Sequence, residues 1–117
     1  MKTKLIKGNI KVICRHQGDF MLIDTPGYYF NVKDYNIFIH KAIRKNDNGI
    51  YFSRKWSLSD PACGRSIFYS EVFDTREEVI KCFYDKFLED YEKIREGDYY
   101  SRLCSMYKLF LEEEKNK

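Results

Sequence analysis

The periodicity of the apolar residues changes once along this chain, near Asp74, and this change constrains the fold more than any other feature. Before Asp74, short alternating apolar runs are separated by turn-forming residues, a pattern typical of β-strands. After Asp74, apolar residues recur every three or four positions, which is typical of amphipathic helices. A strand-rich half followed by a helical half predicts an α+β fold, in which helices cover one antiparallel sheet.

The first half of the chain predicts five to six strands. Each break between them contains Gly, Pro, Asn or Asp, and connections this short require antiparallel neighbours. Thr25–Gly27 is interpreted as one such break, and Asp60–Gly64 as the corner before the last strand. Alternation predicts that Ile37, Ile39 and Ile43 share one face. The predicted strands are Ile10–Arg15, Phe20–Ile23, Tyr28–Val32, Ile37–Ile43, Ile50–Leu58 and Ser66–Phe73.

The second half predicts two helices, over about residues 75–96 and 99–112. Thr75 and Glu78 have the spacing of a capping box, which marks the start of the first helix. Gly97 is expected to end this helix and Asp98 to cap the next one, and residues 113–117 are expected to fray. The first helix would lay one continuous apolar stripe on the sheet, formed by Ile80, Phe83, Tyr84, Phe87, Tyr91 and Ile94.

A chain of 117 residues has room for a single domain, β-rich over 8–73 and helical over 75–112. Aromatic residues make up 17% of it, and they supply enough apolar area for a core that needs neither a metal nor a disulfide. The basic start MKTKLIKGNIK lacks the apolar region of a signal peptide, and no apolar run reaches the roughly 20 residues of a membrane span. We therefore expect a cytoplasmic protein with free thiols at Cys14, Cys63, Cys82 and Cys104, disulfides being the weaker alternative.

Candidate catalytic and metal-binding residues are few. Cys63 lies in a Pro/Gly corner, and a catalytic thiol needs a lowered pKa and a histidine base beside it. Cys14 and His16 could share a strand face as metal ligands, but two ligands do not make a site. His40 and Cys63 would have to converge with them, and no CxxC is present. Nucleotide-binding and hydrolase motifs are also absent from the sequence. We predict no enzyme activity, no metal and no cofactor.

Charge is divided along the chain. Residues 1–70 contain 12 Lys and Arg against 5 Asp and Glu, whereas residues 71–117 contain 9 against 13. The predicted hairpin around Arg44–Trp56 combines cations with aromatic residues. It could bind phosphate and stack on bases, or meet an acidic protein surface, or simply be a solvated hairpin with a buried Trp56. The predicted partner-binding residues are Lys41, Arg44, Lys45, Tyr51, Arg54 and Lys55.

The stretch from Lys55 to Phe83 consists of a strand with Trp56, a Pro/Gly corner, a second strand and a Thr-x-x-Glu helix start. This arrangement resembles small orphan proteins carried by phages and mobile elements of low-GC bacteria, some of which are anti-CRISPR or other anti-defence inhibitors. The resemblance implies a cofactor-free binding protein that blocks a CRISPR effector or another defence nuclease in a bacterial or phage-infected cell. Its motif is structural and transfers no site residue.

The alternative function is a small nucleic-acid-binding protein that uses the same hairpin. The oligomeric state stays open, and includes a homodimer, because several strands are apolar on both sides.

Overall fold

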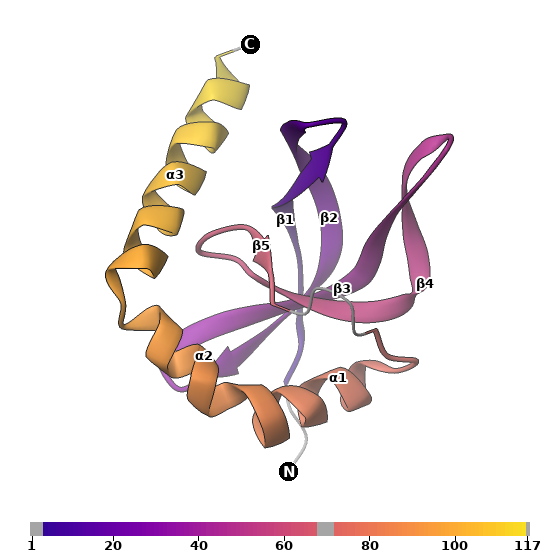
Figure 1. Ribbon diagram of the computed structural model, residues 1–117. Coiled ribbons are helices and arrows are strands. Elements are labelled where there is room, and N and C mark those ends of the chain that lie inside the picture. Colours follow the sequence, from indigo (N-terminus) through magenta and orange to yellow (C-terminus); the bar gives the residue numbers. More distant parts are fainter. Residues whose placement is uncertain (1–3, 68–71, 117) are drawn as a thin grey trace.

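Five antiparallel strands, in the order β1-β2-β3-β4-β5, form the sheet in a computed structural model that describes residues 4–67 and 72–116, without the His16 side chain. Helices follow the sheet in the chain and cover one of its faces (Figure 1). The predicted α+β fold is therefore confirmed. The strands are β1 Ile6–His16, β2 Asp19–Val32, β3 Tyr35–Asn46, β4 Gly49–Asp60 and β5 Arg65–Ser66. The helical segments are α1 Arg76–Cys82, the π-helix η1 Phe83–Phe87, α2 Leu88–Arg95 and α3 Asp98–Lys115.

Strand β2 runs unbroken through Thr25–Gly27, so the break predicted there is wrong. Pro26 lacks an N–H, but β3 pairs with β2 only from Gly27 onward, so Pro26 has a strand neighbour on one side alone. Gly27 is required by the close approach of β3, because a Cβ at this position would lie 2.1 Å from the Ile39 carbonyl oxygen. The Pro26–Gly27 pair, which is typical of a turn, therefore lies within a strand in this protein.

The sheet curls until its two ends meet. The Ile13 N–H of β1 donates to the Gly64 carbonyl, in the corner after β4, over 2.7 Å. Ile37 and Ile39 pack under the helices, but Ile43 packs on the other side, against Ile10, Val12 and Phe38. The prediction that Ile43 shares their face is wrong, and the change falls where the register of β3 against β4 shifts, between Lys41 and Ile43.

The two ends of the predicted last strand, Ser66–Phe73, both pair with β4 in the structure. Arg65–Ser66 forms β5, and Phe73 makes an isolated bridge with Trp56 of β4. The backbone N–H of each of Trp56 and Phe73 donates to the carbonyl of the other, at 2.7 and 3.0 Å. Residues 68–71, within the predicted strand, lie outside the described residues. The bridge to Phe73 places the start of α1 beside β4.

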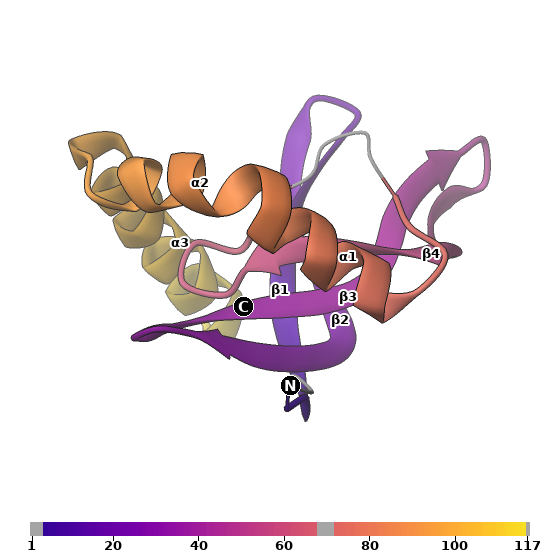
Figure 2. The same ribbon diagram turned by 90° about the horizontal axis from the view of Figure 1, so that it is seen from below.

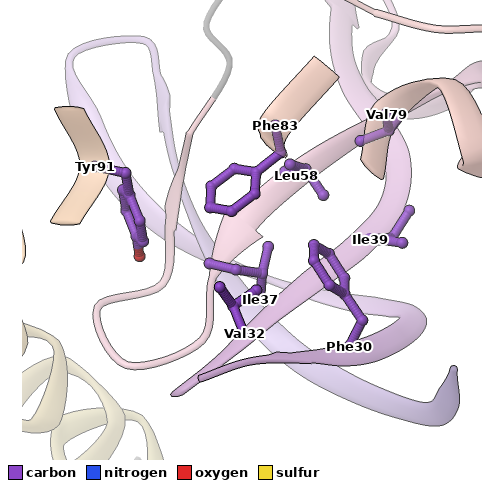
Figure 3. Close-up of a cluster of buried hydrophobic side chains, with 8 residues drawn as sticks. All are labelled: Phe30, Val32, Ile37, Ile39, Leu58, Val79, Phe83 and Tyr91. Carbon is purple, nitrogen blue, oxygen red and sulfur yellow. The ribbon is translucent and has the colours of Figure 1, made fainter. Parts of the chain in front are cut away.

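The main core lies between the sheet and the helices (Figures 2 and 3). Val79 and Phe83 point from the helices toward side chains of β2, β3 and β4, and Tyr91 lies on the same side further along the helical layer. Phe83 contacts Phe30 and Tyr91 edge-on, with ring centroids 6.1 and 5.7 Å apart. The buried members of this cluster are Phe30, Val32, Ile37, Ile39, Leu58, Val79, Phe83 and Tyr91.

The first predicted helix is confirmed over nearly its whole length, but a π-helical segment interrupts it. The extra residue of a π-turn delays every later position by about 100° around the axis. Tyr91 therefore turns onto the sheet, whereas Ile94 turns away and is 54% exposed. The predicted stripe is wrong at Ile94 and at Tyr84, which is exposed, and it omits the fully buried Val79.

The N-terminus of α1 is capped as predicted, with the Thr75 hydroxyl accepting the Glu78 N–H at 3.2 Å. We expect Thr75→Ala to lower the free energy of unfolding by about 1 kcal/mol, because it leaves this amide without its acceptor. Thr75→Ser keeps the hydroxyl and should stay within a few tenths of a kcal/mol of the unchanged protein. Urea unfolding measures both, and equal losses in the two variants would contradict the capping role.

Helix α3 extends further at both ends than predicted. Gly97 is its N-cap and Asp98 its first residue, so the predicted Asp98 cap is wrong by one position. Residues 113–115, which we expected to fray, continue the helix to Lys115, and residue 117 lies outside the described part of the chain. Glu114 forms an ion pair with Lys11 of β1 at 2.8 Å, and the Tyr107 hydroxyl donates to the Lys11 carbonyl at 2.5 Å. These contacts hold the C-terminal turns against β1.

Candidate binding surface

An open groove of about 470 Å³ lies where β2, β3 and β4 meet the N-terminal end of β1. Strand pairing creates it, because Lys41 stands opposite Trp56 and Tyr28 opposite Ile39. The groove combines two lysines with two aromatic residues, and none of its lining residues among those described is acidic. Its lining residues are Lys7, Gly8, Pro26, Gly27, Tyr28, Lys41 and Trp56.

Two cations lie over the aromatic rings of this groove. The Lys41 ammonium is 4.2 Å from the centroid of the Trp56 ring and also donates to the Arg54 carbonyl at 3.0 Å. The Arg76 guanidinium is 4.6 Å from the Tyr28 centroid and 5.5 Å from that of Trp56. Such contacts contribute about 0.5–1 kcal/mol each at exposed sites. They fix positive charge at defined positions, and we call Lys7, Tyr28, Lys41, Trp56 and Arg76 the basic–aromatic surface.

The predicted partner-binding residues do not all reach this surface. Lys41 lies within it, beside half-buried Trp56, and the paired residues Arg44 and Tyr51 lie further out on the β3–β4 hairpin. Lys45 instead donates to the Arg15 carbonyl of β1.

The other two predicted residues lie in an irregular stretch of β4. Residues 53–55 of β4 stand where β3 has only Ala42, and the Ser53 hydroxyl accepts the Lys55 N–H at 2.9 Å. Arg54 and Lys55 are both exposed there, and Lys55 forms an ion pair with Asp74.

Sequence reasoning missed three members of the basic–aromatic surface, Lys7, Tyr28 and Arg76. Arg76 is the first residue of α1, and the Trp56–Phe73 bridge brings it to β4. Tyr28 and Lys7 are paired strand neighbours of β2 and β1, so they follow once the register is known. The sequence does contain one local signal for Arg76. It directly follows the predicted Thr75 cap, so Arg76 is expected at the start of the helix.

A second polar cluster is buried where β4 ends. Asp60, 2% exposed, accepts hydrogen bonds from the hydroxyls of Tyr91 and Tyr100, the latter at 2.6 Å, and Arg95 approaches the same carboxylate oxygen at 3.4 Å. Arg95 also donates to the Tyr100 hydroxyl at 2.7 Å and stacks on Tyr35, 4.0 Å from its centroid. Burial, reinforced by the Asp60 carboxylate, raises the pKa of both Tyr91 and Tyr100. The cluster joins the corner after β4 to α2 and α3.

The candidate nucleophile and metal ligands have other surroundings. Asp60–Gly64 forms the predicted corner, and burial raises the pKa of Cys63 to about 12, which disfavours the reactive thiolate. The two ring nitrogens of buried His40 lie 2.7 Å from the Ser59 hydroxyl and 2.7 Å from the Lys41 carbonyl, and burial lowers the pKa of the imidazole. Across the described residues, no three His, Cys, Asp or Glu side chains are arranged to hold a metal ion. The candidate ligand His16 has its side chain outside the described part.

The four cysteines at positions 14, 63, 82 and 104 are free thiols. Within the described chain, no helix combines the length and the apolar character that crossing a membrane requires. Comparisons with protein-family models, curated proteins and solved structures found no match to this chain.

Proposed function

We propose that this chain is a non-enzymatic binding protein that docks its basic–aromatic surface on an acidic surface of a protein partner. The observation that carries the proposal is the groove itself, in which Lys7, Lys41, Tyr28 and Trp56 converge with no acid among the described lining residues. Complementary charge across an interface speeds encounter and selects the partner. Arg76, from a separate element, adds a third cation.

The cations over the Tyr28 and Trp56 rings favour a protein partner over nucleic-acid bases stacked on these rings. Proteins that bind single-stranded nucleic acid offer aromatic faces on which bases stack. Here the Lys41 ammonium and the Arg76 guanidinium both lie over Trp56, and Arg76 lies over Tyr28. A base would have to displace these cations, whereas a carboxylate on a protein surface could approach them directly.

The resemblance to anti-defence proteins gives the partner class. We propose a bacterial defence nuclease, such as a CRISPR effector, which binds nucleic acid and which an inhibitor blocks by occupying a binding surface. The nucleic-acid-binding alternative has its support elsewhere, in the hairpin arm where Arg54 and Tyr51 are exposed and Arg44 is half-buried beside Tyr51. Phosphate binding there would weaken steeply as salt rises.

A pull-down from bacterial lysate tests this function. The tagged protein is incubated with and without nuclease treatment, and bound proteins are identified by mass spectrometry. The proposal expects one stoichiometric protein that survives nuclease. Recovery that disappears with nuclease would instead support the nucleic-acid alternative, and an empty pull-down would count against both.

The basic–aromatic surface itself is tested with the double variant Lys41→Glu/Arg76→Glu. We expect it to weaken affinity for the captured protein at least about tenfold, because two attractive charges become repulsive at the contact. The matched control is Lys86→Glu/Lys108→Glu, which makes the same change in net charge at two exposed helix positions. Calorimetric titration compares them, and equal affinities of the two double variants would contradict the assignment of this surface.

A further inference from the structure

Helix α3 is more apolar than its contact with the sheet requires. Its inner face buries Tyr100 and Tyr107. With about 100° between successive residues, Tyr99, Met106 and Leu109 fall within an arc of about 80°, which begins beside the buried face at Tyr99 and reaches the outer side of the helix at Leu109. Tyr99 is 68% and Leu109 59% exposed. The opposite flank is polar and exposed, and consists of Ser101, Ser105, Lys108 and Glu112.

The apolar flank continues beyond α3 at both ends. Ile94 lines the same hollow as Tyr99 and Leu103 near the start of the helix. Phe20 and Met21, at the tip of the β1–β2 hairpin, lie beside Phe110 near its end. We call this the α3 strip, and it holds six of the ten large apolar side chains exposed in the described residues. Exposed large apolar side chains that gather along one side of a molecule are typical of an interaction site. The six are Ile94, Tyr99, Met106, Leu109, Phe20 and Met21.

Two charged residues on the same flank give the strip a pattern that complements itself. Arg102 precedes Met106 and Glu113 follows Leu109, each by four positions. Both are exposed, and neither forms an ion pair among the described residues. In an antiparallel pair of identical helices centred between residues 107 and 108, Met106 would meet Leu109 and Arg102 would meet Glu113, each contact occurring twice. Such self-complementarity is what a twofold interface requires.

We propose that the α3 strip binds a second copy of this chain, through antiparallel pairing of the two α3 helices. The opposed helix dipoles add to the match of charge. Both views place α3 on the side of the molecule away from the β3–β4 hairpin (Figures 1 and 2). The dimer therefore leaves both hairpins free, and this inference does not depend on the proposed function.

Sedimentation velocity over a concentration series, together with light scattering, tests the dimer. The unchanged protein should approach twice the chain mass of 14.2 kDa as its concentration rises. Leu109→Glu places a charge in the apolar centre and should raise the dissociation constant at least about tenfold. Lys108→Glu, on the polar flank, is the matched control and should leave that constant unchanged. A monomer at every concentration, or a dimer indifferent to Leu109→Glu, would overturn the proposal.

A charge swap tests the antiparallel register. Arg102→Glu and Glu113→Arg should each weaken the dimer by about fivefold or more, because each sets like charges opposite one another twice. The double variant Arg102→Glu/Glu113→Arg re-forms both pairs with reversed polarity and should restore dimerisation. Loss of the dimer in both single variants without recovery in the double variant would show that the two helices do not pair in this register.

Discussion

Replacing Asp60 with alanine is expected to lower the free energy of unfolding by about 3–5 kcal/mol, as measured by urea denaturation at neutral pH. Asp60 is the acceptor of two buried tyrosine hydroxyls, and each hydroxyl left without an acceptor costs about 1–3 kcal/mol; Arg95, whose side chain is 24% exposed, also loses its counterion. The Arg95 guanidinium packs against the rings of Tyr35 and Tyr100.

The matched control is Asp74→Ala, which removes another aspartate that forms an ion pair, here with Lys55 at the surface. Exposed pairs contribute about 0–1 kcal/mol, so this variant should remain close to the unchanged protein. Tyr100→Phe serves as a milder test of the buried cluster, and we expect a loss of about 1–3 kcal/mol because its hydroxyl donates to Asp60 and accepts from Arg95. Equal stabilities of the Asp60 and Asp74 variants would show that the buried cluster does not stabilise the fold.

The contacts of Asp60 could not be predicted from the sequence, although its position in a corner could. Its place in a Pro/Gly corner follows from its neighbours in the chain, and the structure confirms the corner. Its partners Tyr91 and Tyr100 lie 31 and 40 positions later. No local pattern connects them, because the connection exists only after α2 and α3 have packed beside the end of β4.

Elements with local signals were predictable. The Thr75 cap, the turn between Asn46 and Gly49 and the helical periodicity each depend on residues a few positions apart, and all three features occur in the structure. Pro26–Gly27 was wrongly predicted as a break because its structure is decided by contacts with a strand further along the chain. Whether a Pro-Gly pair turns or extends depends here on where β3 begins to pair with β2, and on how closely the Ile39 carbonyl approaches Gly27.

The candidate binding surface likewise contains residues whose positions follow from local signals and residues whose positions do not. Lys41 and Trp56 come together through the β3–β4 hairpin, and the sequence predicts this hairpin but not which of its residues pair. Arg76 joins them only because Phe73 pairs with Trp56, a contact between segments separated by the corner and β5. The register shift after Lys41 then directs Lys45 toward β1. The alternation of a regular hairpin does not predict that outcome.

Phe83→Ala is expected to lower the free energy of unfolding by about 3–5 kcal/mol, the usual cost of removing a buried phenylalanine. Phe83 is fully buried at the first position of the π-helix and packs edge-on against Phe30 and Tyr91. The cavity would open at the centre of the core between the helices and the sheet (Figure 3). Urea unfolding measures the loss, and near-ultraviolet circular dichroism reports whether the aromatic packing is retained.

Ile94→Ala is the control that separates the π-interrupted helix from a regular one. In an uninterrupted α-helix, Ile94 would lie on the same face as Phe83, eleven residues before it, and its truncation would cost about 2–5 kcal/mol. The extra residue of the π-turn instead leaves Ile94 more than half exposed. We therefore expect a loss of about 0.5 kcal/mol or less at concentrations where the chain is monomeric. Val79→Ala, at a fully buried position outside the predicted stripe, should cost more than Ile94→Ala although it removes a smaller side chain. The opposite order would mean that the helix keeps its α-helical phase through residues 83–87.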